Sequence, residues 1–554
     1  MAIVITPKKA CSVNPLKMSQ PIGSALAFMG IKNCMPLFHG SQGCTSFGLV
    51  LFVRHFKEAI PLQTTAMSEV ATVLGGLENV EQAVITIANR QKPSIIGISS
   101  TGVTETKGDD VDAYIKLIRD KHPELDHIAL VYVSTPDFKD AFQDGWAKTV
   151  TKLVEQLVQT VPADAERLAN RVNLLPGAHL TPGDIDELRE VLEAFGLEAL
   201  VLPDLSGSLD GHIPDDFTPT TLGGISLEEI AGLGLSAHTI AVGEQMRDAA
   251  TALKTRTGVP YTLFDRLTGL DANDQFITLC ARVSGRPVPT KIRRQRGQLV
   301  DAMLDGHFHF GGKKVAIGAE PDLLWTLSQW ATELGAEIAA AVTTTASPLL
   351  ERVATDEVLI GDLEDLEARA AGCDLLMTHS HGRQAAERLK IPFYRIGIPM
   401  FDRLGAAHQT IVGYRGTRNL IFEIANMFIA NGHEPNPQTW SLPEEVVEKP
   451  TACPDGGVAR CSDKSAGSGF GREAPRSGET QDVFHHSSCT PTYTPDPALQ
   501  LPSLEPAPDG ACLRQSKSAP GGFVRAPCPR GARDGFSTTS EESGHVGTAA
   551  LAAH

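Results

Sequence analysis

The sequence contains no hydrophobic run long enough to cross a lipid bilayer. A spanning helix needs about 20 consecutive apolar residues, and the best candidate, Phe47 to Val53, ends at Arg54. The first residues also lack the apolar core of a secretory signal, because Thr6-Pro7-Lys8-Lys9 follows the opening five residues. We therefore expect a cytoplasmic protein without a membrane-spanning segment. In that compartment cysteines stay reduced and serve metals more often than disulfides.

Positive charge is also in short supply. The 554 residues include 49 Lys and Arg against 66 Asp and Glu, which gives a formal net charge of −17. This balance argues against a broad nucleic-acid surface. The run Lys291 to Arg296 is a local exception, and we interpret it as the solvated face of a helix. An attraction surface for an acidic cargo is the alternative.

Motifs for nucleotide binding and hydrolytic catalysis are missing as well. No Walker A sequence occurs, and the strand predicted at 313–318 leads into Ala319-Glu320-Pro321-Asp322, which lacks the glycines of a pyrophosphate cradle. No Ser–His–Asp or paired-carboxylate constellation stands out. The acidic segment Asp362 to Glu367 is interpreted as an exposed helical face. The sequence therefore predicts neither ATP nor NAD chemistry, and we assign no catalytic residue.

Short apolar runs alternate with longer helical patterns along most of the chain. This alternation predicts mainly parallel sheets covered on both faces by helices. Because the length suits roughly three domains, we expect three Rossmann-like α/β domains at 1–165, 166–288 and 289–447. Helices are predicted at 109–120 and 265–283, and strands at 94–101, 128–135, 171–176, 198–202, 237–242, 313–318, 337–343, 374–380 and 392–398.

The composition changes near Lys449. Residues 451–554 hold 11 of the 36 prolines and show no sustained periodicity. Such a composition buries too little apolar surface to offset the entropy of ordering the chain, so we expect a disordered tail at 448–554. Five of the 10 cysteines lie there, at irregular spacings that match no zinc or ferredoxin pattern.

The most informative segment is His39-Gly40-Ser41-Gln42-Gly43-Cys44. We interpret it as a tight loop that presents one thiol, in which Gly40 and Gly43 allow positive φ and close approach of a bulky group. The apolar run 47–53 would anchor this loop against a packed element. A thiolate is the soft ligand that iron–sulfur clusters use, but a buried free cysteine in a turn is the commoner occurrence. The residues alone leave both interpretations open.

Several separated phrases resemble the β-type subunits of the nitrogenase component 1 family. The similarity extends from about residue 10 to about residue 445. Within the family it is closest to the branch that serves biosynthesis of the iron–molybdenum cofactor. The phrases that carry the resemblance are Asn14 to Pro21, Met35 to Phe38, Arg54 to Glu58, Pro61 to Met67 and Pro203 to His212.

The resemblance implies a cluster-binding role for one cysteine. Family β subunits carry three cysteines that help to hold an eight-iron cluster, and the matching positions here are Ser19, Cys44 and Gly102. A hydroxyl is a poor ligand for a soft metal and glycine offers none. The resemblance therefore implies a smaller [4Fe–4S] cluster, to which Cys44 contributes the one metal ligand of this chain and a partner contributes three. Gly40, Gly43 and Gly102 would shape the space around that cluster.

The remaining candidate ligands are weaker. Asp137 replaces a family serine near the cluster, and a turn-initiating or helix-capping role is favoured over a role as a hard ligand. The others are interpreted as packing thiols or as surface and capping histidines: Cys11, Cys34, His307, His309, His379 and His381.

The resemblance also implies partners and a function. We expect a cofactor-assembly scaffold rather than a turnover enzyme, paired with an α-type subunit, NifE, in an α₂β₂ assembly. The α-type partner would mainly hold a precursor of the iron–molybdenum cofactor, which matures with molybdenum and homocitrate before transfer to apo-nitrogenase. The reductase iron protein and precursor donor and carrier proteins would be further partners. A catalytic β subunit of nitrogenase or of a tetrapyrrole reductase is one alternative, and a structural partner whose Cys44 binds nothing is another.

Overall fold

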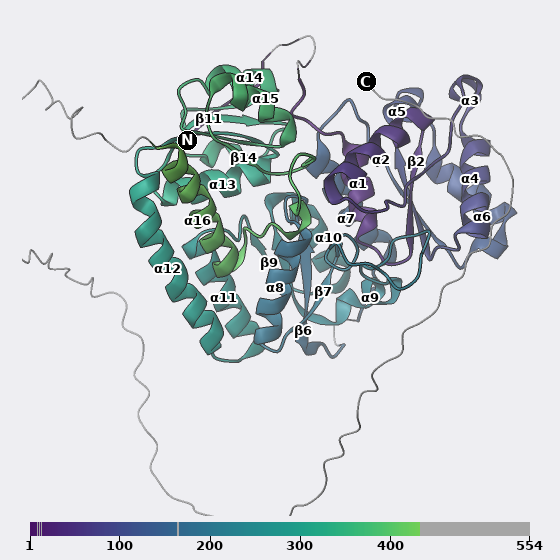
Figure 1. Cartoon of the computed structure of the whole chain (residues 1–554). Coiled ribbons are helices and arrows are strands. Elements are labelled where there is room, and N and C mark those ends of the chain that lie inside the picture. The colour runs from purple at the N-terminus through teal and green to yellow at the C-terminus, as the bar shows by residue number, and fades with distance from the viewer. Residues whose placement is uncertain (8, 10–11, 13, 163–164, 433–554) are drawn as a thin grey trace, which may run out of the picture. The chain divides into compact units, whose positions relative to one another are not determined.

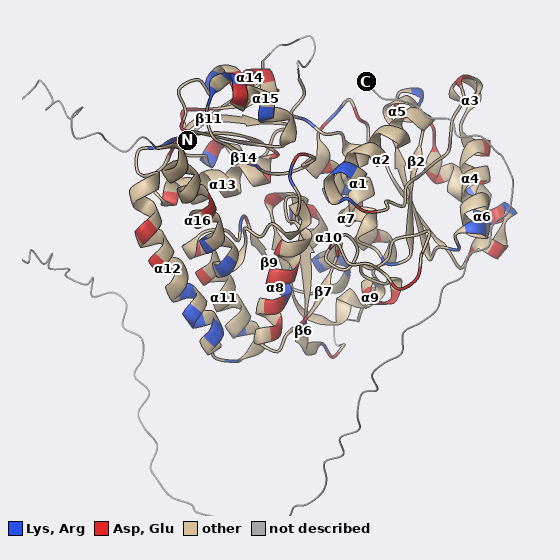
Figure 2. Cartoon of the chain, viewed as in Figure 1, with Lys and Arg blue, Asp and Glu red and all other residues tan. Residues whose placement is uncertain are grey.

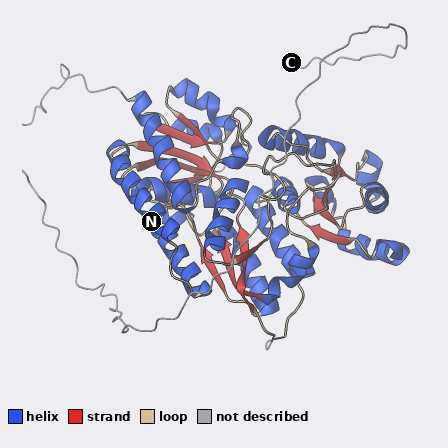
Figure 3. Ribbon diagram, turned by 60° about the horizontal axis from the view of Figure 1, so that its bottom comes forward, coloured by secondary structure: helices blue, strands red, loops and turns tan. Residues whose placement is uncertain are grey.

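A computed structural model describes residues 1–7, 9, 12, 14–162 and 165–432 (Figure 1). The tail predicted at 448–554 lies outside the described residues. Within the described part there are three sheets, and every strand pairing is parallel. Helices surround the strands in Figure 3. The predicted α/β class with mainly parallel sheets is therefore confirmed.

The first sheet has the order β3-β2-β4-β5. Alternate residues of a strand point to opposite faces, and both faces are buried here, which explains the continuous apolar runs. Phe38 and Val131 pack with α1 and α7, whereas Leu37 and Ile96 pack with α4 and α6. The elements are β2 (Cys34–His39), β3 (Gln63–Thr64), β4 (Ile95–Ser100), β5 (Ala129–Val133), α1 (Gln20–Met29), α2 (Gln42–Phe56), α3 (Glu69–Leu74), α4 (Leu77–Arg90), α5 (Gly102–Lys107), α6 (Val111–Lys121) and α7 (Phe142–Leu157).

The second sheet has the order β7-β6-β8-β9. The helix predicted at 265–283 begins later, at Leu270, so its predicted start is wrong. Residues 265–269 instead connect the edge strand at 261–264 to the helix, and Gly269, with φ of 104°, turns the chain there. The elements are β6 (Leu168–Pro176), β7 (Glu198–Val201), β8 (Ser236–Val242), β9 (Tyr261–Phe264), α8 (Pro182–Ala194), α9 (Leu227–Ala231), α10 (Arg247–Thr257) and α11 (Leu270–Ser284).

The third sheet has the order β1-β12-β11-β10-β13-β14. Its edge strand β1 comes from the start of the chain, where Ile3 is in register with Glu357. The sheet therefore joins segments more than 300 residues apart in sequence. The elements are β1 (Ile3–Ile5), β10 (Lys314–Ala319), β11 (Glu337–Thr343), β12 (Glu357–Ile360), β13 (Leu375–Thr378), β14 (Phe393–Arg395), α12 (Thr290–Phe310), α13 (Pro321–Glu333), α14 (Leu363–Arg369), α15 (Arg383–Leu389) and α16 (Gly413–Asn431).

Two charged segments test the sequence interpretation. The basic run lies on α12, where Ile292 and Gln295 are buried and the cationic residues are exposed, as the blue ribbon of α12 in Figure 2 shows. The solvated helix face is therefore confirmed. The acidic segment differs, because Asp362 is only 1% exposed. It caps α14 by accepting a hydrogen bond from the Asp365 amide at 3.0 Å, and it pairs with Lys9 at 3.1 Å. The expectation that Asp362 to Glu367 forms an exposed helical face is therefore wrong for Asp362, whereas Glu364 is exposed.

No helix in the described part of the chain is long and apolar enough to cross a membrane. This agrees with the short apolar runs in the sequence. The longest helix, α12, carries its basic residues on the exposed face.

Candidate functional site

Cys44 lies in the first turn of α2, directly after the carboxyl end of β2. All four cysteines in the described part are free thiols, and Cys44 is the one among them that is not fully buried. Burial raises the pKa of Cys280 to about 12 and also raises the pKa values of Cys34 and Cys373. Those three thiols therefore stay protonated and serve as packing residues, as predicted for Cys34. Cys44 is the accessible thiol of this part. Cys11 lies outside the described residues.

The local geometry corrects the interpretation of the Cys44 segment as a tight loop. His39 ends β2, Ser41 occupies the N-cap position of α2, and Cys44 is already helical, 3.7 Å from the Ser41 hydroxyl. Neither Gly40 nor Gly43 has a positive φ, so that part of the prediction is wrong. The two glycines serve for steric reasons instead.

Gly40 and Gly43 differ in what surrounds them. A Cβ on buried Gly40 would overlap Thr101 Oγ1, which donates a hydrogen bond to the His39 carbonyl at 3.0 Å. A Cβ on Gly43 would meet only the Ser41 hydroxyl, at 3.8 Å, and Gly43 is exposed. Gly40 therefore allows two connections of this chain to pack closely. Gly43 leaves bare backbone beside Cys44, which fits the expected close approach of an external group.

Only one side of helix α2 packs against the core. Leu51 and Phe52 on α2 are buried in the core. On the opposite side Phe47, Val50 and Val53 are 65%, 55% and 43% exposed. The expectation that the run 47–53 anchors this segment against a packed element is therefore confirmed through its inner side chains. Its outer side chains form an apolar face, which we name the α2 face.

The other two predicted cluster positions lie at the same edge of the first sheet. Ser19 is the N-cap residue of α1, and its neighbour Gln20 donates from Nε2 to the Pro136 carbonyl at 2.9 Å. Gly102 is the first residue of α5, and a Cβ on it would overlap the Asp137 carboxylate. The absent side chain of residue 102 is thus replaced in space by the side chain of Asp137.

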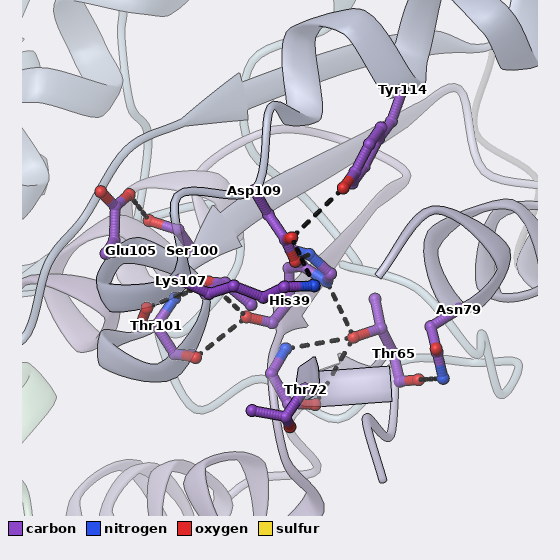
Figure 4. Close-up of polar contacts among 12 residues, drawn as sticks. His39, Thr65, Thr72, Asn79, Ser100, Thr101, Glu105, Lys107, Asp109 and Tyr114 are labelled. Carbon is purple, nitrogen blue, oxygen red and sulfur yellow. Dashed lines mark hydrogen bonds and ion pairs between the residues drawn. The ribbon is translucent and has the colours of Figure 1, made fainter. Parts of the chain in front are cut away.

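A buried polar network holds the start of the Cys44 segment (Figure 4). His39 Nδ1 lies 3.0 Å from Thr65 Oγ1, and His39 Nε2 lies 3.2 Å from Asp109 Oδ2. Lys107 Nζ and the Tyr114 hydroxyl contact the other Asp109 oxygen at 3.3 and 3.2 Å. Burial lowers the pKa of His39, and the Asp109 carboxylate offsets part of this effect. His39 is fully buried and both of its ring nitrogens are engaged, so this pair fixes the position of the end of β2.

The sequence interpretation missed this network. Asp109 was predicted to begin a helix, but α6 starts at Val111 and Asp110 caps it. Asp109 lies outside the helix because it turns towards His39. A buried contact between residues 70 positions apart leaves no periodic pattern in the sequence. The one local indication was a histidine directly before Gly40.

A second network ties the ends of β4 and β5 together beside Gly102. Ser100 Oγ accepts from the Thr135 amide at 2.6 Å, and Thr135 Oγ1 donates to the Ser100 carbonyl at 2.8 Å. Glu105 accepts from Ser134 Oγ at 2.6 Å and from Ser100 Oγ. These contacts fix the loop that carries Asp137 next to Gly102.

The other candidate ligands do not converge on a site. His379 is buried, its Nε2 donates to the Leu16 carbonyl at 3.0 Å, and its Nδ1 accepts from the His381 amide at 3.3 Å. The His307 ring contacts the Leu304 carbonyl within α12, and His309 lies two residues further along the same helix. Capping and surface roles fit all four histidines. Among the described residues, no group of three or more His, Cys, Asp or Glu side chains could hold a metal ion, so a cluster at Cys44 would need thiols from elsewhere.

Comparison with known proteins identifies the family. The model of the nitrogenase component 1 type oxidoreductases matches residues 19–429. The chain belongs to the nitrogenase component 1 family. The prediction from the sequence phrases is therefore confirmed.

The alignments with relatives in the nitrogenase component 1 family include nearly the full length of each relative. The chain is 63% identical over 469 residues to the nitrogenase iron–molybdenum cofactor biosynthesis protein NifN of Bradyrhizobium diazoefficiens, with 83% of this chain and 100% of the relative aligned. It is 52% identical to the NifN of Mesorhizobium japonicum, with 81% and 99% aligned. The solved structure of nitrogenase Cp1 at pH 6.5 superposes with a TM-score of 0.73 at 32% identity, covering 79% of this chain and 98% of that one.

Proposed function

We propose that this chain is the β-type subunit of a scaffold on which a precursor of the iron–molybdenum cofactor matures before transfer to apo-nitrogenase. In this proposal Cys44 contributes one ligand to a [4Fe–4S] cluster shared with the α-type partner, NifE. The similarity to NifN proteins supports the scaffold role. The accessible thiol of Cys44 in the first turn of α2 is the observation that carries the cluster assignment.

The residues around Cys44 fit a group held at an interface. Gly43 leaves open space next to the thiol, so a bulky inorganic cluster can approach the backbone. The amide groups at the start of the 15-residue helix α2 favour an anionic group, as thiolate-bound clusters are. The α2 face beside it exposes three large apolar side chains. Such exposure in a soluble chain is typical of a surface that a partner covers.

The same edge of the sheet argues against an eight-iron cluster. The hydroxyl of Ser19 is a poor ligand for iron–sulfur clusters, and residue 102 has no side chain. The space that a cysteine side chain would enter from position 102 is occupied by the Asp137 carboxylate. One thiol from this chain therefore suits a small cluster whose other ligands come from NifE, in the α₂β₂ assembly that the family resemblance implies.

Bound at this position, the cluster would supply one-electron transfer, with the reductase iron protein as donor. The residues of this chain would orient and shield it. The His39–Asp109 pair and Thr101 hold the end of β2, from which α2 and Cys44 extend. Phe47 and Val50 follow the thiol on the exposed face of α2, where they would exclude water once a partner covers them. Precursor donor and carrier proteins would meet the assembled scaffold, where NifE mainly holds the precursor.

The test is the iron content and the EPR spectrum of the dithionite-reduced complex, purified without air with its α-type partner. Cys44→Ser should abolish a [4Fe–4S] signal while leaving the complex assembled. Cys280→Ser is the matched control, because that thiol is buried in α11 and should not affect iron. An unchanged cluster in Cys44→Ser would refute the ligand assignment. An eight-iron signature in the wild type would restore the catalytic alternative.

A further inference from the structure

A cavity of about 70 Å³ lies where the connections of the three sheets meet. Its walls come from α1, the end of α2, the start of α7, and the segments that follow β6, β10 and β14. Carboxyl ends of parallel strands and junctions between sheets are common ligand sites in α/β proteins. Most of the wall is apolar, with Leu26, Phe142, Leu323, Leu327, Ile396 and Met400 among its residues.

Two histidines in the wall have a defined tautomer. His55 Nδ1 accepts a hydrogen bond from the Met400 amide at 2.9 Å, so its proton is on Nε2. His179 Nδ1 lies 3.4 Å from Gln245 Nε2, an amide nitrogen that also donates to Asp322 Oδ2 at 3.0 Å. His179 therefore also carries its proton on Nε2. Burial lowers the pKa of His55 to about 3 and that of His179 to about 4, so both rings are neutral donors at pH 7.

The third polar group is Glu320, the N-cap residue of α13. Its Oε2 accepts from the Gln143 amide at 3.2 Å. Burial raises the pKa of Glu320 to about 8; the charge of Asp144 adds to this effect, and Lys17 opposes it. At pH 7 the carboxyl group is therefore mostly protonated and carries a hydroxyl that can donate. His55, His179 and Glu320 thus give the mostly apolar wall three uncharged groups that can donate hydrogen bonds. The other polar residues of the wall are Gln143, Thr181, Tyr394 and Gln409.

We propose that this cavity is a binding site for a small monocarboxylate of the size of acetate or propionate. A carboxylate has only acceptors, and hydrogen bonds to an ionised oxygen are the stronger kind. Several donors together offset the cost of removing that charge from water. The short aliphatic part of the ligand matches the apolar wall. Because a cavity needs about 10–15 Å³ of this kind of volume to hold one water, about 70 Å³ admits a molecule of only a few heavy atoms. The site is separate from Cys44 and does not rest on the scaffold role.

The cavity shares one wall residue, Gln143, with a second hollow. This residue lines the cavity and also an open cleft of about 760 Å³ between α7, residues 244–248 and residues 345–348. The Gln143 side chain accepts one hydrogen bond, from the Asp322 amide at 3.2 Å. Gln143 is therefore a wall residue common to the cavity and the cleft, and one hydrogen bond holds its side chain in place.

The experiment is ligand-observed NMR of sodium acetate and sodium propionate with the full-length chain. Wild type should show saturable binding, and acetamide should compete poorly because it lacks the charge. Ala178→Leu adds volume to the wall and should weaken binding at least tenfold. Glu364→Gln, a change on the exposed face of α14, is the matched control and should bind like wild type. Thermal unfolding verifies that each variant is folded.

The pH dependence gives an independent check. Since ligand binding needs the neutral form of Glu320, wild-type affinity should fall about tenfold between pH 7 and pH 9. Glu320→Gln keeps a neutral donor and should lose this pH dependence, while His55 and His179 stay neutral over that range. Saturable binding with these responses supports the proposal. No saturation up to about 50 mM ligand, or binding that Ala178→Leu leaves unchanged in a folded protein, would overturn it.

Discussion

The two glycines that flank Ser41 and Gln42 should respond in opposite directions to the same substitution. In Gly40→Ala the new methyl group would overlap Thr101 Oγ1, and Thr101 is itself buried and β-branched, so it cannot move aside easily. Overpacking a tight core site costs about 1–3 kcal/mol. Displacing the Thr101 hydroxyl from the His39 carbonyl adds about 1 kcal/mol. We expect a total loss of roughly 2–4 kcal/mol in the free energy of unfolding.

Gly43→Ala should be neutral or stabilising. Gly43 is exposed within α2 and has open space around its Cα. Replacing an exposed helical glycine by alanine gains up to about 1 kcal/mol, and less in the first turn of a helix. If Gly43 faces a cluster, however, the new methyl group would lower the iron content of the partner complex. Substitution of Gly40 should therefore lower stability, whereas substitution of Gly43 should lower the iron content without lowering stability.

Urea unfolding of the two single variants measures both effects. Together with the single variant Thr101→Ala, the double variant Gly40→Ala/Thr101→Ala completes a cycle, because removing Thr101 Oγ1 and Cγ2 takes away the overlap. Its cost should be smaller than the sum of the single costs by about 1 kcal/mol or more. Additive costs, or a Gly40→Ala protein as stable as wild type, would refute the steric reasoning.

Two further predictions concern pH and the partner surface. Burial lowers the pKa of His379 to about 4. As the pH drops below about 6.5, this histidine takes up a proton in the unfolded chain but not yet in the folded one, so the free energy of unfolding must fall. His379→Gln should remove about 1 kcal/mol of the loss in unfolding free energy between pH 6.5 and 5.5. If urea unfolding at the two pH values gave the same loss for the variant as for wild type, the lowered pKa of His379 would be contradicted. Phe47→Asp should abolish co-purification with the α-type partner without changing the melting temperature. Phe217→Asp, at a site that is 85% exposed against 65% for Phe47, should leave the complex intact. Loss of partner binding in both variants, or in neither, would show that the α2 face has no special role.

The local pattern of the sequence was sufficient for most strands and for the fold class. The runs at 94–101, 337–343 and 374–380 became β4, β11 and β13, because buried parallel strands need apolar side chains on both faces. The exposed basic face of α12 could also be predicted from the sequence, because charges at exposed helical positions follow the helical repeat. The phrases around Cys44 were specific enough to identify the family, which the matching family model confirms. The division into domains at 165 and 288 stays a prediction.

Contacts between distant segments decided the rest. No local pattern indicates that Ile3–Ile5 pairs with β12, or that Asp109 leaves its helix to bind His39. The roles of Gly40, Gly43 and Gly102 depend on which atoms lie opposite each Cα, and Thr101 and Asp137 reach those places only through the packing of neighbouring strand ends. Likewise, His55, His179 and Glu320 meet at one cavity because three sheets place their loops together. The sequence by itself determined most of the strands, the family and the one candidate thiol. Only the tertiary structure decided which groups surround them, because steric contact and burial arise between residues that the chain keeps far apart.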